Sequence, residues 1–334
     1  MKSKLLVAIG IAVSAVLLWL ALRGTDFRSI ADSLSVANPA WAAPFLIFLF
    51  GFYWLKSMRW RDLLPSAENA SAGGLFPIVM IGYAGTAVLP MQLGELIRTY
   101  IAAKKYALPY SLSLSSVVIE RLFDLMTILF LLAAVSLAGQ STPEVMVSAG
   151  YLIGAATAVG ITLSFLLATY ADRFVAITLR LTTFLSERLR DAVVDQLRAA
   201  AAGLATIRSP GLVARVAVNS LVQWSLMGLC IWISLIALDV AVPPSGVVLV
   251  LVATIIGVSL PTSPGYVGNI QFAFVIALQP FGVSAAAAVA ASIFYHVLAY
   301  ASVVLVGFFF LHRLGLDMRT VESAARESVD SPQG

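Results

Sequence analysis

Five charged residues interrupt long apolar sequence in two short stretches, and their types suit the binding of an ionic group. Glu95 and Arg98 lie in "LPMQLGELIRTY", and Glu120, Arg121 and Asp124 lie in "VVIERLFDLMTILFLL". The second group lies about 10–17 Å beyond the expected start of its helix. Because each charge buried at such a depth in a membrane costs several kcal/mol, we expect these side chains to pair and to line a polar cavity.

An anion such as a lipid phosphate fits this composition. A helix start exposes free N–H groups that favour anions, and guanidinium groups add charge-assisted hydrogen bonds. Arg98 lies three residues after Glu95 and one helix before Glu120 and Asp124, so it can pair with any of these acids. Three alternatives remain open: Glu95 only caps a helix, the group is a structural ion pair that locks helices together, or the carboxylates titrate and couple transport to protons.

A second set of polar residues lies within and after "LPTSPGYVG" and completes the candidate substrate-binding site. Hydroxyls and amides predominate, and His296 is equally consistent with a packed core histidine. The candidate substrate-binding residues are Glu95, Arg98, Glu120, Arg121, Asp124, Thr262, Ser263, Asn269, Gln271 and His296.

The composition is that of an integral membrane protein. Of 334 residues, 60% are hydrophobic and 11% are charged, whereas soluble domains are about 25% charged. A single cysteine and two histidines exclude a disulfide within the chain and provide no metal-ligand spacing. No P-loop or GxSxG motif is present. We therefore expect no cofactor, no metal and no catalytic residue, and we attribute the net charge of +4 to basic loops rather than to nucleic-acid binding.

The elements that must position these residues are apolar helices. About 20 apolar residues span a bilayer. Segments that meet this length are 4–22, 39–57, 113–137, 146–169, 212–238 and 285–311. The first is expected to be a retained helix rather than a cleaved signal, because its apolar core is too long. The polar end, 315–334, is expected to be a cytoplasmic tail.

Two further apolar regions, 73–107 and 246–280, are interrupted by helix-breaking residues. The breaks are formed by Pro90, Gly94, Pro261, Pro264, Gly265 and Gly268. Each half is too short to cross a bilayer, so each region is expected to form a re-entrant hairpin buried in protein or lining a wet cavity. Full spanning pairs are the alternative.

The two breaks share a proline-to-glycine spacing of four, and each is followed by a small turn and a full span. We therefore predict an all-α polytopic membrane protein with two inverted span–broken hairpin–span repeats, 39–137 and 212–311, within one domain, 1–314. In such duplicated folds the binding site lies near the midplane, where the breaks meet.

The basic residues predict that both termini are cytoplasmic. This arrangement places 18 of the 21 basic residues inside, Arg23 and Arg28 outside, and Arg121 within the membrane. The stretch 172–209 carries apolar residues every three or four positions and many arginines. It is expected to be an amphipathic helix on the inner membrane surface; a connector helix packed on the membrane domain is the alternative.

The first motif, P–x–x–x–G–E–x–x–R followed by E–R–x–x–D, resembles that of a flippase-like bacterial membrane protein family. This family includes the membrane part of lysylphosphatidylglycerol synthases. "LPTSPGYVGNIQFAF" resembles its second motif, P–x–x–P–G–G–x–G–x–x–E. Three positions depart from the pattern: Tyr266 replaces a glycine, Gln271 or Asn269 stands near the usual glutamate, and His296 stands where arginine is expected.

The resemblance implies an inner-membrane protein that moves phospholipids or lipid-linked glycans between leaflets, with a membrane lipid as its substrate. Only a short tail follows residue 311, so we expect no aminoacyl transfer by this chain, and a lipid-modifying enzyme is a candidate partner. The alternatives are an intramembrane enzyme acting on lipid-linked sugars, with Glu120 or Asp124 as acid or base, and a non-transporting subunit that positions a partner enzyme. The sequence does not indicate an oligomeric state.

Overall fold

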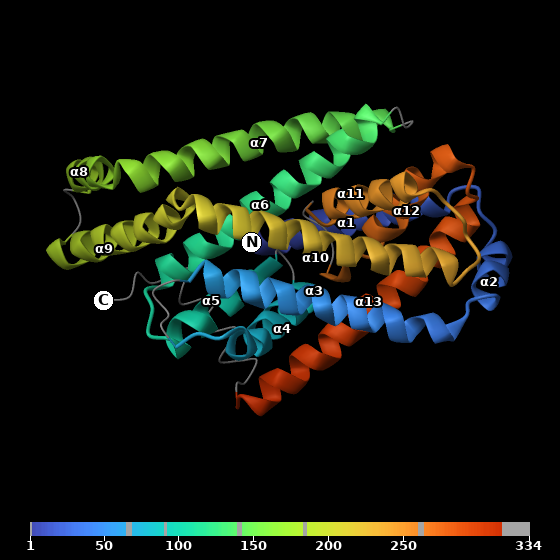
Figure 1. Ribbon diagram of the computed structural model, residues 1–334, viewed down its shortest axis with the longest axis horizontal. Coiled ribbons are helices and arrows are strands. Elements are labelled where there is room, and N and C mark those ends of the chain that lie inside the picture. The colour runs from blue at the N-terminus through green and yellow to red at the C-terminus, as the bar shows by residue number, and fades with distance from the viewer. Residues whose placement is uncertain are drawn as a thin grey trace.

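The computed structural model describes residues 2–64, 69–89, 92–138, 142–182, 186–259 and 264–315, with side chains for all of these except 2–9, 206, 207 and 259. Figure 1 shows a bundle of long helices with shorter ones packed among them, and the described residues form no strand. The chain is an all-helical, multi-pass membrane protein, as its composition predicted.

Each of the six expected spans is a helix. They are α1 (Lys2–Leu22), α3 (Ala42–Asp62, preceded by the turn η1, Pro39–Trp41), α6 (Tyr110–Leu137), α7 (Glu144–Thr169), α10 (Pro210–Ile236) and α13 (Ala285–Arg313). Among the described residues, four helices are long and apolar enough to cross a membrane: α3 with η1, α7, α10 and α13. The end of α1 and α2 (Phe27–Ser35) form a bent pair, at 78°, that would make a fifth. The 28-residue α6 is long enough as well, but it carries three charged residues.

Both interrupted regions consist of two short helices that pack against each other. The first hairpin is α4 (Ala72–Val88) with α5 (Leu93–Lys105), and the second is α11 (Pro244–Ser259) with α12 (Asn269–Leu278). At about 1.5 Å per residue, the 17 residues of α4 reach only about 25 Å, short of a hydrocarbon core of about 30 Å. Each region is thus interrupted, and its re-entrant course stays a prediction.

Glycine permits the close approach that forms each hairpin. A Cβ on Gly94 would collide with the carbonyl oxygen of Gly82 and with the nitrogen and hydroxyl of Thr86 on α4. In the second hairpin, Gly265 and Gly268 have φ of +81° and +91°, a region that glycine occupies without steric cost. Pro90 and Pro261, predicted to belong to the breaks, lie outside the described residues, whereas Pro264 begins the short turn η4 (Pro264–Tyr266).

The tips of the two hairpins meet. The Gln92 side-chain amide donates to the carbonyl of Val258 at 3.1 Å, and the Tyr300 hydroxyl of α13 donates to the carbonyl of Ala87 at 3.1 Å. Segments far apart in the sequence are thereby joined where the helices are broken.

The stretch 172–209 corrects our expectation of one helix. It forms α8 (Ala171–Leu181) and α9 (Glu187–Leu204), and in Figure 1 α8 is seen end-on while α9 is seen lengthwise. The reason is packing: α9 lies against α6 and α7, with Gly203 against Ser115, and Gln196 accepts a hydrogen bond from the backbone of Ser111. This arrangement makes α9 a connector packed on the bundle. Most of the expected tail, residues 316–334, lies outside the described residues.

We predict that Gly94→Ala destabilises the protein by about 1–3 kcal/mol or more, because the added methyl group meets backbone atoms that have no room to move. Thermal unfolding of the purified protein in detergent measures the effect. Gly211→Ala is the matched control: it lies in the first turn of α10, a Cβ there has nothing within 4 Å, and alanine favours helix by about 1 kcal/mol. Equal stability of the two variants would contradict the close packing of α4 and α5.

Candidate functional site

Two carboxylates and three cations lie together in the interior of the bundle. Glu120 and Asp124 of α6 contact Lys56 and Arg59 of α3, and Arg98 of α5 completes the group. Each of these five residues is at most 3% exposed. We call them the buried cluster. Burial of this kind is expensive unless charges are paired at short range.

Helical spacing brings these groups together. Glu120 and Asp124 are four residues apart and therefore share one face of α6. Lys56 and Arg59 are three apart on α3, so they project from one face as well. The Lys56 ammonium bridges the two acids, at 3.0 Å from Oε1 of Glu120 and 3.2 Å from Oδ2 of Asp124.

Arg59 makes the parallel bridge. Its guanidinium lies 2.8 Å from Oδ1 of Asp124 and 3.1 Å from Oε1 of Glu120. Helix α10 supports Asp124 from the other side: the indole N–H of Trp224 donates to Oδ1 at 3.0 Å, and the Gln223 amide lies at 3.4 Å. Asp124 is thus held from two helices besides its own, which fixes the position of α6 against α3 and α10.

Aromatic rings surround the cations of the buried cluster. The Lys56 ammonium lies 5.3–5.6 Å from the ring centres of Phe52, Tyr83 and Trp224. The Arg98 guanidinium lies 5.0 Å from the centre of Trp60 and 5.7 Å from that of Tyr83. Contacts of this geometry stabilise cations and keep water away from them.

Arg98 is the least satisfied member of the buried cluster. Its Nη1 lies 3.1 Å from Oε2 of Glu120, yet among the described residues none of its three guanidinium nitrogens has a hydrogen bond of good geometry. Nε and Nη2 of Arg59 and the hydroxyl of Tyr83 are also buried without such a partner in the described part of the chain. Several donors of the site, and Oε2 of Glu120 among its acceptors, therefore lack a hydrogen bond of good geometry within the described residues.

Glu95 and Arg121 form a second, separate ion pair beside the buried cluster. The guanidinium of Arg121 on α6 contacts the carboxylate of Glu95 on α5. Their side chains are 40% and 18% exposed, so this pair is accessible where the buried cluster is not. Arg121 thus pairs with an acid on another helix, one of the arrangements that its position allowed, whereas Arg98 pairs with Glu120.

The polar residues of the second break also meet. Nδ1 of His296 lies 3.3 Å from the Gln271 amide nitrogen, and Oε1 of Gln271 accepts from the backbone N–H of Gly268 at 2.7 Å. The amide of Asn269 donates to the carbonyl of Gly257 at 2.7 Å and so closes the hairpin. Thr262 and Ser263 lie outside the described residues.

Tyr266, which replaces a glycine of the family pattern, adopts a positive φ of 56°. Glycine occupies this left-handed region readily, and tyrosine rarely does. Tyr266 thus adopts a backbone conformation that a glycine at this position would occupy without steric cost.

Lys56 and Arg59 were missed as site residues, because both were counted among the basic residues that face the cytoplasm, whereas the structure buries their side chains. The expected span ended at residue 57, but α3 continues to Asp62 and buries both side chains. Arg98, also counted as cytoplasmic, is buried too. Charge balance could have identified them. Two acids on one helix face need more cationic partners than Arg121 alone, and Lys56 and Arg59, three residues apart on α3, were the nearest candidates in the sequence.

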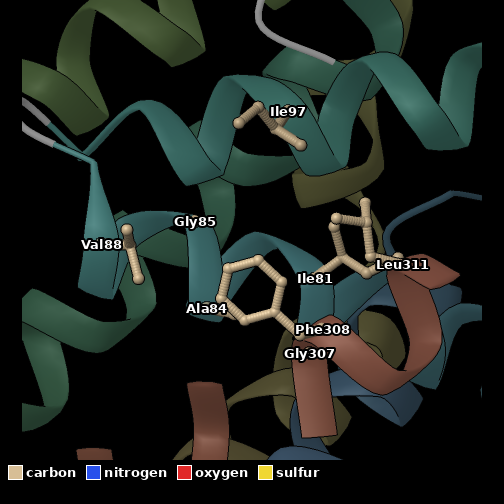
Figure 2. Close-up of a pocket in the computed structure, with 8 residues that line it drawn as sticks. All are labelled: Ile81, Ala84, Gly85, Val88, Ile97, Gly307, Phe308 and Leu311. Atoms are coloured by element: carbon tan, nitrogen blue, oxygen red, sulfur yellow. The ribbon is translucent and has the colours of Figure 1, made fainter. Parts of the chain in front are cut away.

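An apolar groove runs along the outer side of the first hairpin, between α4, α5 and α13 (Figure 2). The groove is shallow: the space inside it is about 20 Å³, and the wider figure of about 310 Å³ includes open solvent. Gly85, Gly307 and Ala84 line it where α4 packs closely against α5 and α13, and Phe308 lies across it. Ile97 belongs to its wall and directly precedes Arg98, so the groove lies next to the buried cluster.

The described residues form a helical membrane domain with two broken hairpins and a buried ionic centre. This arrangement defines the class of protein. The chain belongs to the family described as the lysylphosphatidylglycerol synthase TM (transmembrane) region, whose model matches residues 7–307. This confirms the resemblance seen in the motifs.

The chain is also similar to a curated protein. "Glycosyltransferase AglD" of Haloferax volcanii is 28% identical over 363 residues, which cover 96% of this chain and 56% of the relative. The chain thus spans little more than half the length of AglD. No solved structure matches.

We predict that Asp124→Asn is far more damaging to stability than Glu95→Gln, although each substitution removes one negative charge at nearly constant shape. The first leaves buried cations unpaired and is expected to cost about 3–5 kcal/mol. The second affects an accessible pair and is expected to cost about 1 kcal/mol or less. Unfolding transitions of both variants in detergent measure the difference, and similar losses would show that the buried cluster is not the tighter of the two sites.

Proposed function

We propose that the protein translocates a lipid with an anionic head group between the leaflets of the membrane. The observation that carries this proposal is the buried cluster, which offers unused guanidinium donors inside a membrane domain. A lipid phosphate supplies the acceptors and the negative charge that these donors lack. The function of a polar centre in such a protein is to shelter a head group that the bilayer interior would exclude.

The accessible pair gives the head group a first contact. Arg121 is exposed enough to receive a phosphate in exchange for Glu95, and Arg98 lies further inside. The groove beside Ile97 is too shallow in this conformation to hold an acyl chain, so in this proposal the acyl chains stay in the bilayer while the head group enters the polar centre. Binding near broken helices in this way is a common arrangement in transporters.

We further propose that residues 39–137 and 212–311 are two inverted repeats, each a span, a re-entrant hairpin and a span. The meeting of Gln92 with Val258 and of Tyr300 with Ala87 supports a site where the two breaks converge. In the conformation described, the buried cluster is closed on all sides. Separation of the hairpin tips would open it.

We place the protein in the bacterial cytoplasmic membrane with both termini inside. The three buried cations, Lys56, Arg59 and Arg98, no longer count toward the loop charge. The bias that remains, fifteen basic residues against two, still favours this orientation.

An intramembrane enzyme acting on lipid-linked sugars is the second candidate function, because AglD is named a glycosyltransferase. In that case Glu120 or Asp124 would act as acid or base. Their tight pairing with three cations holds both carboxylates as ion-pair partners, which favours transport over proton transfer. Turnover of a polyprenyl-linked sugar by the purified protein would favour the enzyme instead.

We predict that Arg98→Gln slows lipid translocation by about 10- to 100-fold, the loss expected for hydrogen bonds to a charged group. Fluorescent phosphatidylglycerol in proteoliposomes, with dithionite quenching of the outer leaflet, measures the rate. Arg61→Gln is the control, since Arg61 lies on the same turn region of α3 as Arg59 but is 42% exposed. A normal rate in Arg98→Gln would overturn the site, and failure of the unsubstituted protein to translocate any lipid would overturn the function.

A further inference from the structure

The buried cluster has an uneven charge. It contains three cationic side chains, Lys56, Arg59 and Arg98, and two carboxylates, Glu120 and Asp124. One positive charge is therefore left without a counter-charge within it. The neighbouring Arg121–Glu95 pair is balanced and adds none.

An excess charge is expensive at this depth. The five residues are at most 3% exposed, and they lie among aromatic rings rather than water. The penalty for a buried charge is offset only by a close partner of opposite sign. Counted over the residues that the structure describes, the cluster lacks one negative charge, and this sets the charge that a ligand bound there should carry.

The unused donors indicate where that charge would lie. Nε and Nη2 of Arg98, Nε of Arg59 and the hydroxyl of Tyr83 are buried without a partner among the described residues, whereas Nη1 of Arg98 and Nη2 of Arg59 each lie 3.1 Å from a carboxylate oxygen of Glu120. The Tyr83 ring contacts both Lys56 and Arg98. The two non-bridging oxygens of a phosphodiester share one negative charge and accept several hydrogen bonds, which suits this set.

We infer that the substrate is a lipid whose head group carries a single negative charge on a phosphodiester, and that the protein discriminates against phosphomonoesters and diphosphates. A monoanion makes the buried cluster neutral. A dianion leaves it with an excess of one negative charge, and a neutral head group leaves the excess of one positive charge. This inference rests on the proposed function and adds to it the charge class of the lipid.

Phosphatidic acid tests the inference with the unsubstituted protein, because its head group changes charge near neutral pH. A phosphomonoester has a second pKa of about 6. At pH 5 the lipid is mainly a monoanion and should be translocated at a rate similar to that of phosphatidylglycerol with identical acyl chains. At pH 8 it is mainly a dianion, and its rate should fall at least about tenfold, whereas phosphatidylglycerol, singly charged at both values, should change little.

A variant that changes the charge of the buried cluster provides a second test of the inference. Glu120→Gln raises the excess to two positive charges, so the discrimination against phosphatidic acid at pH 8 should disappear or reverse. Size-exclusion profiles establish that the variant is folded; if it is not, the pH comparison with the unsubstituted protein decides alone. Equal rates for both lipids at pH 8 would overturn this inference and leave translocation intact. Absence of translocation for both lipids at both pH values would overturn the proposed function itself.

Discussion

The pairing of five charged side chains away from water is the interaction on which the rest of the structure depends. Glu120 and Asp124 on α6 are held by cations from α3 and α5, and α10 donates further hydrogen bonds to Asp124. None of these groups is stable in the bundle alone, since removing one partner from a buried ion pair costs about 3–5 kcal/mol. Four helices are therefore fixed in position and rotation by one ionic centre, which apolar packing alone does not specify.

The broken hairpins are the second constraint, and they connect the ionic centre with the surface. Gly94 allows α5 to lie directly on α4, and this close approach places Arg98 inside while Glu95 stays near the edge. The two hairpins meet where the Gln92 amide donates to the carbonyl of Val258. A site that is both charged and sealed suits a ligand that must be removed from water during transport, and the excess of positive charge suits a phosphate.

Much of the fold followed from the sequence, because the apolar lengths and the proline and glycine breaks act locally. The partners of the buried charged residues did not follow from the sequence. Lys56 and Arg59 lie at the end of an apolar run and were counted as cytoplasmic charges, although α3 continues past them and buries both. The choice of Glu120 rather than Glu95 for Arg98 depends on how α5 lies on α4, a tertiary contact that no periodicity reveals. The division of residues 172–209 into α8 and α9 is likewise set by packing on α6 and α7.

The central claim is that a lipid phosphate completes the buried cluster. The most direct measurement is a solid-state NMR distance between the phosphorus of phosphatidylglycerol and the guanidinium nitrogens of Arg98 in reconstituted protein with isotope-labelled arginine. The phosphorus should dephase the Arg98 signal as expected for hydrogen-bonded contact, roughly 3–4 Å, and this coupling should vanish in Arg98→Gln. A labelled signal that arises only from exposed arginines such as Arg61, and persists unchanged in Arg98→Gln, would contradict the account.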